Sequence, residues 1–217
     1  MPRAPRIWFP GAVYHIIQHG VDQQNIFNYD DDRYNFLKKV EDFKKEMPFK
    51  VYLYVLMDNH YHLTIETSEI NISHIMQAIN TSYATQFNKK YKRKGHLFYG
   101  RFKGILVDKD NYLLELSRYI HLNPVKAGIV DDPEDYIWSS YRSYINKELN
   151  FLVDKDLILS GFQNSTVDSH KRYEYFVKER LNINRETDWL NENIKRQRFL
   201  GSDGFIKTSL EKGSDAF

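Results

Sequence analysis

The sequence predicts an α+β fold in which helices cover an antiparallel sheet, as in ferredoxin-like and RRM-like proteins. The first observation is the order of the predicted elements, β-α-β-β-α-β, over about two thirds of the chain. The second is a two-residue turn between the central strands, which indicates an antiparallel hairpin. The third is the length of 217 residues, enough for one substantial domain with an appendage. We therefore predict a sheet domain at 1–148 and a mainly helical appendage at 149–217.

The first half of the predicted sheet is rich in residues with high β propensity. Residues 12–19 form a strand that ends at a glycine. A helix begins at Asp30, where three successive aspartates supply a cap and an acidic first turn, and it ends before Pro48. Residues 49–57 and 60–66 then form the two strands of the hairpin.

In the second half of the predicted domain, a helix is again followed by strands. Asn71 or Ser73 caps a helix in which apolar residues recur at intervals of three to four through Arg93. Glycines follow, and the segments 96–99 and 102–107 are predicted to be short strands.

The third predicted helix begins near Asp110 or Asn111 and runs to Asn123, just before Pro124. Because the residue before a proline avoids the α region, we expect a kink or a helix end there. In the appendage, short helices are predicted at 169–181 and 191–199.

Composition excludes several classes of chemistry. The chain has no cysteine, so it forms no disulfide, zinc–thiolate site or cysteine nucleophile, which is typical of a reducing compartment. No run approaches the roughly 18 apolar residues of a membrane span, and the N-terminal residues lack the apolar segment of a signal peptide. We expect a soluble, cytoplasmic protein with no membrane partner.

Charge is unevenly distributed along the chain. From Ile70 to Val107 there is no acidic residue but there are seven Lys and Arg residues, whereas the whole chain carries only +2. Aromatic residues are interspersed with these charges, as expected where bases stack on rings and phosphates meet cations. The alternative is a solvated, Lys-rich helix end followed by an amphipathic hairpin.

Two histidines stand two positions apart at the start of a predicted strand. Side chains at i and i+2 leave the same face of a strand, so His60 and His62 can converge on a divalent metal while Tyr61 faces the other way. With 8 histidines, about 0.3 such pairs are expected by chance, so the pair is weak evidence by itself.

One turn of the third helix separates Tyr119 from Asn123 on a shared face. A phenol beside a divalent cation can attack a phosphodiester, because the cation offsets the charge that develops in the transition state. Spacing alone does not select this residue from 16 tyrosines.

Three motifs together resemble a known family: residues 56–62 (LMDNHYH), 95–103 (GHLFYGRFK) and 117–128 (SRYIHLNPVKAG). They are similar to the single-tyrosine HUH transposases, and most similar to the REP-associated tyrosine transposases of bacteria. The resemblance extends from Pro5 to Tyr141, with the motifs in the family's order.

This resemblance implies an RRM-like HUH nuclease domain that acts on single-stranded DNA, often beside a hairpin. His60 and His62 match the pair that binds Mg²⁺ or Mn²⁺, Tyr119 matches the nucleophile, and Asn123 stands where the family has a third polar ligand. Asp58 replaces the family's usual proline; its carboxylate could approach the metal, shift metal affinity or cap the turn, and we favour the cap.

The basic stretch is the predicted DNA-binding surface. Seven cations are expected on phosphates, and two rings are candidates for base stacking. These residues are Lys89, Lys90, Lys92, Arg93, Lys94, Arg101 and Lys103, with Tyr99 or Phe102 as the stacking ring.

Other polar residues are interpreted as structural. His121 lies on the other side of its helix from Tyr119 and is left out of the ligand set, and Arg118 is suited equally to a phosphate or a salt bridge. The remaining histidines are also interpreted as structural: His15, His19, His74, His96 and His170.

The predicted function is metal-dependent cleavage and transfer of single-stranded DNA through a covalent 5′-phosphotyrosine. The alternatives are a domesticated, non-cleaving binder of hairpin or single-stranded nucleic acid, and a metal-dependent hydrolase that uses water. A homodimer is a further expectation, because some relatives exchange the tyrosine helix between subunits, so that Tyr119 could serve either its own histidines or a partner's.

Overall fold

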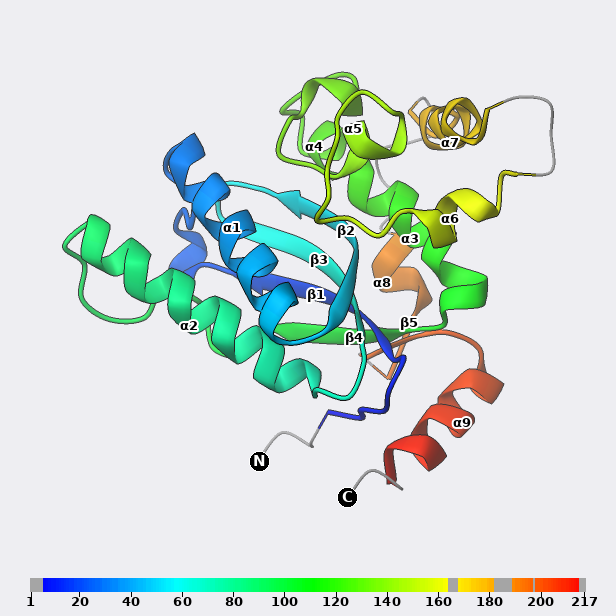
Figure 1. Ribbon diagram of the computed structural model, residues 1–217, viewed down its shortest axis with the longest axis horizontal. Helices are drawn as coiled ribbons and strands as arrows, with labels where there is room; N and C mark the ends of the chain where they lie inside the picture. Colours follow the sequence, from blue (N-terminus) through cyan, green and yellow to red (C-terminus); the bar gives the residue numbers. More distant parts are fainter. Residues whose placement is uncertain (1–5, 164–167, 182–188, 197, 215–217) are drawn as a thin grey trace.

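A six-stranded sheet forms the centre of the computed structural model, which describes residues 6–163, 168–181, 189–196 and 198–214 (Figure 1). The strand order is β2-β3-β1-β4-β6-β5, and all neighbours are antiparallel except β4 and β6. The strands are β1 (Val13–His19), β2 (Phe49–Leu56), β3 (His60–Thr67), β4 (Lys103–Val107), β5 (Ile194–Lys195) and β6 (Phe199–Leu200).

Helices lie on both faces of this sheet. The described α-helices are α1 (Asp30–Glu46), α2 (Ile72–Lys90), α3 (Lys109–His121), α4 (Asn123–Lys126), α5 (Tyr141–Tyr144), α6 (Asp156–Ser160), α7 (Ser169–Lys178), α8 (Trp189–Asn193) and α9 (Asp203–Ser214). Two short 3₁₀ helices, Val21–Gln23 and Pro133–Asp135, lie in connecting loops. Among the described helices, none is both long enough and apolar enough to span a bilayer.

The two faces of β3 carry different chemistry because its side chains alternate. On one face Tyr61 packs against Phe36 of α1, with ring centroids 4.6 Å apart, and its hydroxyl donates to Asn80 Oδ1 of α2 at 2.7 Å. On the other face His62 meets α3. Helices α1 and α2 therefore cover one face and α3 covers the other, as Figure 1 shows.

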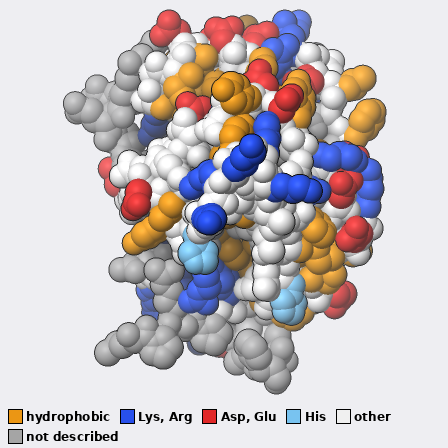
Figure 2. Space-filling view, turned by 90° about the vertical axis from the view of Figure 1, so that its left-hand side faces the viewer, with side chains coloured by type: hydrophobic (Ala, Val, Ile, Leu, Met, Phe, Trp, Pro, Cys, Tyr) orange, Lys and Arg blue, Asp and Glu red, His pale blue; other side chains and the backbone are white. Residues whose placement is uncertain are grey.

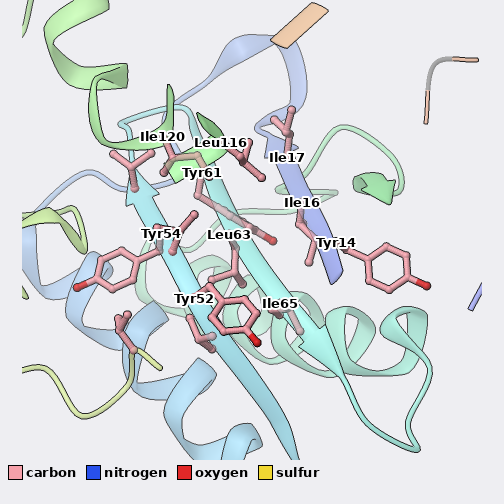
Figure 3. Close-up of a cluster of buried hydrophobic side chains, with 14 of the residues drawn as sticks. Tyr14, Ile16, Ile17, Tyr52, Tyr54, Tyr61, Leu63, Ile65, Leu116 and Ile120 are labelled. Carbon is pink, nitrogen blue, oxygen red and sulfur yellow. The ribbon is translucent and has the colours of Figure 1, made fainter. Parts of the chain in front are cut away.

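The core is continuous through the sheet. Figure 3 shows side chains of β1, β2 and β3 gathered with Leu116 and Ile120 of α3, and all of these are buried. The β-α-β-β-α-β order with helices packed on an antiparallel sheet is confirmed.

The predicted strand at 96–99 is wrong. Glycines with positive φ, Gly95 (+91°) and Gly100 (+60°), flank this segment and turn the chain out of an extended path. The carbonyl of Leu97 accepts from the backbone of Val21, and Phe98 makes only an isolated bridge. The segment is a loop that contacts the end of β1, where the Tyr99 N–H donates to the His19 carbonyl, without forming a strand.

The predicted helix at 191–199 is also wrong. Helix α8 ends at Asn193, and a short β5–β6 hairpin extends the sheet, with β6 parallel to β4; Gln197 lies outside the described residues. Two-residue strands are too short to show a period of two in the sequence. The boundary at 148 stays a prediction, and the structure adds that the later segment supplies the sheet edge beyond β4.

A buried carboxylate joins the start of α1 to the end of α2. Asp32 is 2% exposed and accepts from the backbone N–H groups of Asn28 and Tyr29, from the Tyr91 hydroxyl and from Lys90 Nζ at 2.6 Å. Burial alone raises the pKa of a carboxyl, but the hydrogen bonds from Lys90, Tyr91 and the two amides outweigh it and lower the pKa of Asp32.

Replacing Asp32 by Asn is therefore expected to lower the free energy of unfolding by about 3 kcal/mol at pH 7, because buried donors lose a charged acceptor. Since the pKa is lower in the folded state, this stabilisation is present above the ordinary carboxyl pKa and disappears as pH falls through the folded value. Urea unfolding of wild type, Asp32→Asn and the exposed control Asp31→Asn measures it. Equal losses in both variants would contradict the prediction.

Candidate active site

The histidine pair lies on the face of β3 that α3 covers. The rings of His60 and His62 are nearly perpendicular, at 77°, with centroids 5.2 Å apart. His62 is 4% exposed and His60 is partly buried. The alternation predicted from the sequence thus brings both imidazoles to one place.

Two further histidines come from the neighbouring strand β1. His19 pairs across the ladder with His60, and their rings stack at 4.8 Å. His15 stacks on His62 at 5.0 Å, with its Nε2 atom 2.8 Å from His62 Nδ1. Sequence reasoning interpreted His15 and His19 as structural and missed this cluster. Their spacing of four in a strand puts them on one face, but only the strand register shows that they meet the pair.

The imidazoles of His15, His60 and His62 are held neutral. Burial lowers the pKa of His15 to about 3 and that of His60 to about 4, and Lys103 near His15 and His19 near His60 act in the same direction. Burial and the other histidines lower the pKa of His62 as well. His60 Nδ1 lies 2.7 Å from Asn59 Oδ1, which can only accept, so the proton sits on Nδ1 and Nε2 keeps its lone pair.

Helix α3 places Tyr119 against these rings within a single chain. Its ring lies edge-on to His62, with centroids 6.0 Å apart, and 6.4 Å from His15. Trp189 of α8 lies 6.1 Å away on another side, and Lys126 Nζ is 5.3 Å from the ring centroid. Neither Trp189 nor Lys126 was among the predicted site residues.

Asn123 begins a new helix one turn after Tyr119. Helix α3 ends at His121, and α4 starts at Asn123 with Pro124 in its first turn, as expected from the proline. The Asn123 side chain is partly buried. Across the described residues, no group of three His, Cys, Asp or Glu side chains could hold a metal ion, so a cation here would need an amide oxygen beside the two imidazoles.

The carboxylate of Asp58 pairs with a distant side chain and does not cap its own turn. It forms an ion pair with Arg33 of α1, while the Asp58 carbonyl accepts from the backbone of Ile26 and Phe27. Arg33 is buried except for 9% of its side chain, so the pair ties the hairpin turn to α1. No local sequence pattern predicted this long-range partner.

Part of the basic stretch meets His19, whose ring stacks on His60, in a cavity of about 870 Å³; the lining residues do not include His60, His62 or Tyr119. Lys103 of β4 pairs with Ile17, which in turn pairs with His62, so the three side chains form one row across the sheet. We call this space the active-site cavity, and it is lined by Ile17, Gln18, His19, Tyr99, Gly100, Arg101, Lys103, Asn191 and Ile194.

Two smaller cavities, of about 430 and 560 Å³, lie along α2 and share five lining residues. We call them together the α2 groove, and the shared residues are Asn80, Thr81, Phe98, Gly100 and Arg101. Gly100 and Arg101 also line the active-site cavity, as do Gln18 and Tyr99 from one smaller cavity each, so the groove and the cavity meet at these four residues. Figure 2 shows Lys and Arg side chains gathered on the side of the molecule where α2 ends.

The predicted DNA-binding residues differ in their exposure and in their partners within the protein. Tyr99 is 70% exposed, and Arg101 and Lys103 are exposed beside it. Lys90 pairs with Asp32, and Arg93 donates to Gln24 at 2.5 Å. The remaining lysines, Lys89, Lys92 and Lys94, are exposed around the end of α2.

The ring of Phe102 is already covered by another side chain of the protein. Its ring is 7% exposed, with the Arg6 guanidinium 3.8 Å from the centroid, and Arg6 also donates to the Phe102 carbonyl. A base could stack there only if the ring were uncovered. Of the two predicted stacking rings, Tyr99 is the accessible one.

His121 and Arg118 hold α3 to the later helices. His121 is fully buried, 2.8 Å from Ser140 Oγ and 2.7 Å from the Tyr173 hydroxyl. Arg118 pairs with Glu115 and donates to the carbonyl of Phe176. These contacts match the structural interpretation of His121 and the salt-bridge alternative for Arg118.

An RRM-like sheet with a histidine pair on an inner strand, faced by a tyrosine from a following helix, defines a protein of the HUH fold. The model of the family "Transposase IS200 like" matches residues 9–123, more than half of the chain, and the chain belongs to this family of DNA-processing transposases.

Two individual proteins are similar to this chain. A Haemophilus influenzae protein assigned as a REP-associated tyrosine transposase is 27% identical over 114 residues, which are 47% of this chain and 64% of that protein's length. The solved structure of a REP-associated tyrosine transposase bound to a REP hairpin superposes with a TM-score of 0.57 at 18% identity, covering 71% of this chain and 94% of the other. At that identity, the structural match supports the fold.

Proposed function

We propose that this protein cleaves single-stranded DNA and transfers the strand through a covalent 5′-phosphotyrosine on Tyr119. The observation that carries the proposal is the contact of the Tyr119 ring with His62 inside one chain, at 6.0 Å between centroids. One chain thus holds a nucleophile and a candidate metal site together. In this proposal Tyr119 acts together with the histidines of its own chain; a homodimer stays a prediction.

The proposed metal ligands are His60, His62 and Asn123, with Mg²⁺ or Mn²⁺ as the ion. The residues fit such an ion because both imidazoles are neutral and an amide oxygen suits a hard cation. When bound, the cation would polarise the scissile phosphate and offset its developing charge. The histidines sit on a rigid, doubly paired strand, so their positions are fixed before DNA binds.

Tyr119 performs the covalent step in this proposal. Its Oη attacks the phosphorus and loses its proton, the P–O3′ bond breaks, and the departing O3′ takes up a proton to leave a free 3′ hydroxyl. Attack on the phosphotyrosine by another 3′ hydroxyl reverses the step, joins the new strand and restores the phenol. The ammonium of Lys126, 5.3 Å from the Tyr119 ring, is placed to attract the phosphate toward the nucleophile.

The DNA is proposed to pass from the α2 groove into the active-site cavity across Gly100 and Arg101. Arg101 and Lys103 would contact phosphates there and Tyr99 would stack on a base, while Lys89, Lys92 and Lys94 would contact phosphates nearer the end of α2. The relative whose structure holds a REP hairpin suggests a hairpin next to the cleaved segment. Such a substrate would place the protein in the cytoplasm.

Binding to single-stranded DNA is expected to weaken steeply with salt. In the double variant Arg101→Gln, Lys103→Gln, the slope of log affinity against log salt should fall by about 1.4, because each phosphate contact on a single strand contributes about 0.7. Fluorescence anisotropy at several salt concentrations measures the slope. Lys38→Gln on α1, which pairs with Asp42, is the control and should leave the slope unchanged. An unaltered slope in the double variant would remove this cavity from the binding path.

The proposal is tested by incubating the protein with labelled single-stranded DNA that carries hairpins from the flanks of its own gene. Mn²⁺, Mg²⁺ or EDTA is added, and the products are separated on a denaturing gel. A protein-linked DNA band that requires the metal supports the proposal. Tight binding without that band, across several flanking sequences, would instead indicate a domesticated, non-cleaving binder.

A further inference from the structure

We propose that His15 is a positioning residue that controls which nitrogen of His62 carries the proton, and that metal binding shifts the tautomers of both rings. This inference rests on the proposed metal site and adds a residue from β1 to it. His15 does not face the metal itself; it acts through the Nδ1 atom of His62.

The sheet fixes the geometry of this pair. His15 Nε2 and His62 Nδ1 are 2.8 Å apart, and the rings stack at 5.0 Å with an angle of 16° between planes. His15 is completely buried and His62 is 4% exposed, so water does not compete for the bond. The strands β1 and β3 are paired along this whole stretch, with Ile17 opposite His62 and His15 opposite Thr64.

Two neutral imidazoles can share this bond in only two ways. In the first, His62 Nδ1–H donates to His15 Nε2, and the lone pair of His62 Nε2 is available to a metal. In the second, His15 Nε2–H donates to His62 Nδ1, and His62 carries its proton on Nε2, where it blocks a metal. Nearby Lys103 disfavours a third state in which His15 gains a second proton.

The other nitrogen of His15 decides between these states in the metal-free protein. His15 Nδ1 is buried and has no hydrogen-bond partner among the residues that the structure describes. In the metal-competent state it would be a buried N–H donor with nothing to accept from it, whereas in the blocked state it is only an unused lone pair. Orphaned donors are rarer in proteins than under-used acceptors. The resting protein therefore favours the blocked state.

Metal binding then changes the position of protons but not their number. The Nε2 proton of His62 leaves to solvent, the Nε2 proton of His15 moves to His62 Nδ1, and His15 takes up a solvent proton on Nδ1. Each ring stays neutral throughout. Partners of this kind that orient a ligating histidine typically change metal affinity by about 10–100-fold when they are lost.

Three variants separate positioning from a general loss of structure. His15→Gln retains an acceptor oxygen near the position of Nε2 and is expected to bind Mn²⁺ close to wild type. His15→Leu removes the acceptor. A metal-bound imidazole donates more strongly than a free one, so this loss costs the metal-bound state more than the metal-free state, and Mn²⁺ is expected to bind about 10–100-fold more weakly. His74→Leu, at an exposed histidine of α2 outside the histidine cluster, is the control for the loss of an imidazole and should leave Mn²⁺ affinity unchanged. Circular dichroism verifies folding of each variant.

Mn²⁺ affinity is measured by electron paramagnetic resonance, and tautomers are read from long-range ¹H–¹⁵N correlations without metal and with Zn²⁺, a diamagnetic ion that imidazole binds well. We expect the His62 proton on Nε2 without metal and on Nδ1 with Zn²⁺. A His62 proton on Nδ1 in both states would overturn the inference, and so would wild-type Mn²⁺ affinity in folded His15→Leu. If wild type binds no metal, the proposed function is overturned as well. If His60→Ala loses binding and His15→Leu keeps it, only the role of His15 is overturned.

Discussion

Replacing Tyr119 by Phe will abolish the protein–DNA adduct and slow strand cleavage by at least about 10³-fold, because only the attacking oxygen is removed. Phenylalanine keeps the ring that packs against His62 and Trp189. The variant should therefore fold and bind single-stranded DNA as wild type does. The measurement is a time course with labelled DNA and Mn²⁺ on a denaturing gel, with anisotropy for affinity.

Tyr99→Phe provides the control, since Tyr99 is an exposed tyrosine that lines the active-site cavity and also loses only a hydroxyl. It should retain the covalent band, because its ring still stacks on a base. A covalent band in Tyr119→Phe would assign the nucleophile to another tyrosine. Cleavage without any band in that variant would mean that water attacks the phosphate directly, as in a metal-dependent hydrolase.

The metal-free protein will lose stability steeply below about pH 6.5. Burial lowers the pKa of His15 and of His121 to about 3 and of His60 to about 4, and it lowers that of His62 too. Between those values and 6.5, each imidazole takes up a proton in the unfolded chain but not in the folded one, so acid favours unfolding. The three groups with folded values of about 3 to 4 give a slope of about 4 kcal/mol per pH unit and a loss of about 5 kcal/mol between pH 6.5 and 5, and His62 adds to both in the same direction.

A loss of that size is comparable with the whole stability of an ordinary domain. Urea unfolding in EDTA at half-unit steps from pH 7.5 to 5 measures the slope. The variant His121→Gln, at a ring that contacts Ser140 and Tyr173, removes one of the four groups, so its slope should be shallower by about 1.4 kcal/mol per pH unit. A free energy of unfolding that stays constant over this range would show that these rings are protonated in the folded protein.

Local sequence patterns predicted the parts of the fold that they determine. The two-residue turn after Met57 correctly predicted the β2–β3 hairpin. Alternation along β3 correctly predicted that His62 and Tyr61 lie on opposite faces of the sheet. Pro124 correctly predicted the end of α3. Each of these features depends on residues that are close together in the sequence.

The remaining features depend on register and on distant partners. His15 meets His62 only because β1 aligns with β3 at a particular offset, and Asp58 meets Arg33 only through the packing of α1. The β5–β6 hairpin forms where the edge of β4 offers pairing, although its own sequence shows no strand pattern. Local periodicity contains no information about such partners.

The parallel pairing of β6 with β4 has a consequence for the order of folding. It joins Leu106 to Phe199, residues far apart in the sequence, whereas the hairpin of β2 and β3 closes over two residues. Contacts across long loops form late, because chain entropy must be lost before they form. During synthesis from the N-terminus, the histidines and Tyr119 emerge before Trp189, Asn191 and Ile194. We therefore expect the nucleophile and its histidines to assemble first and the far wall of the cavity to close last.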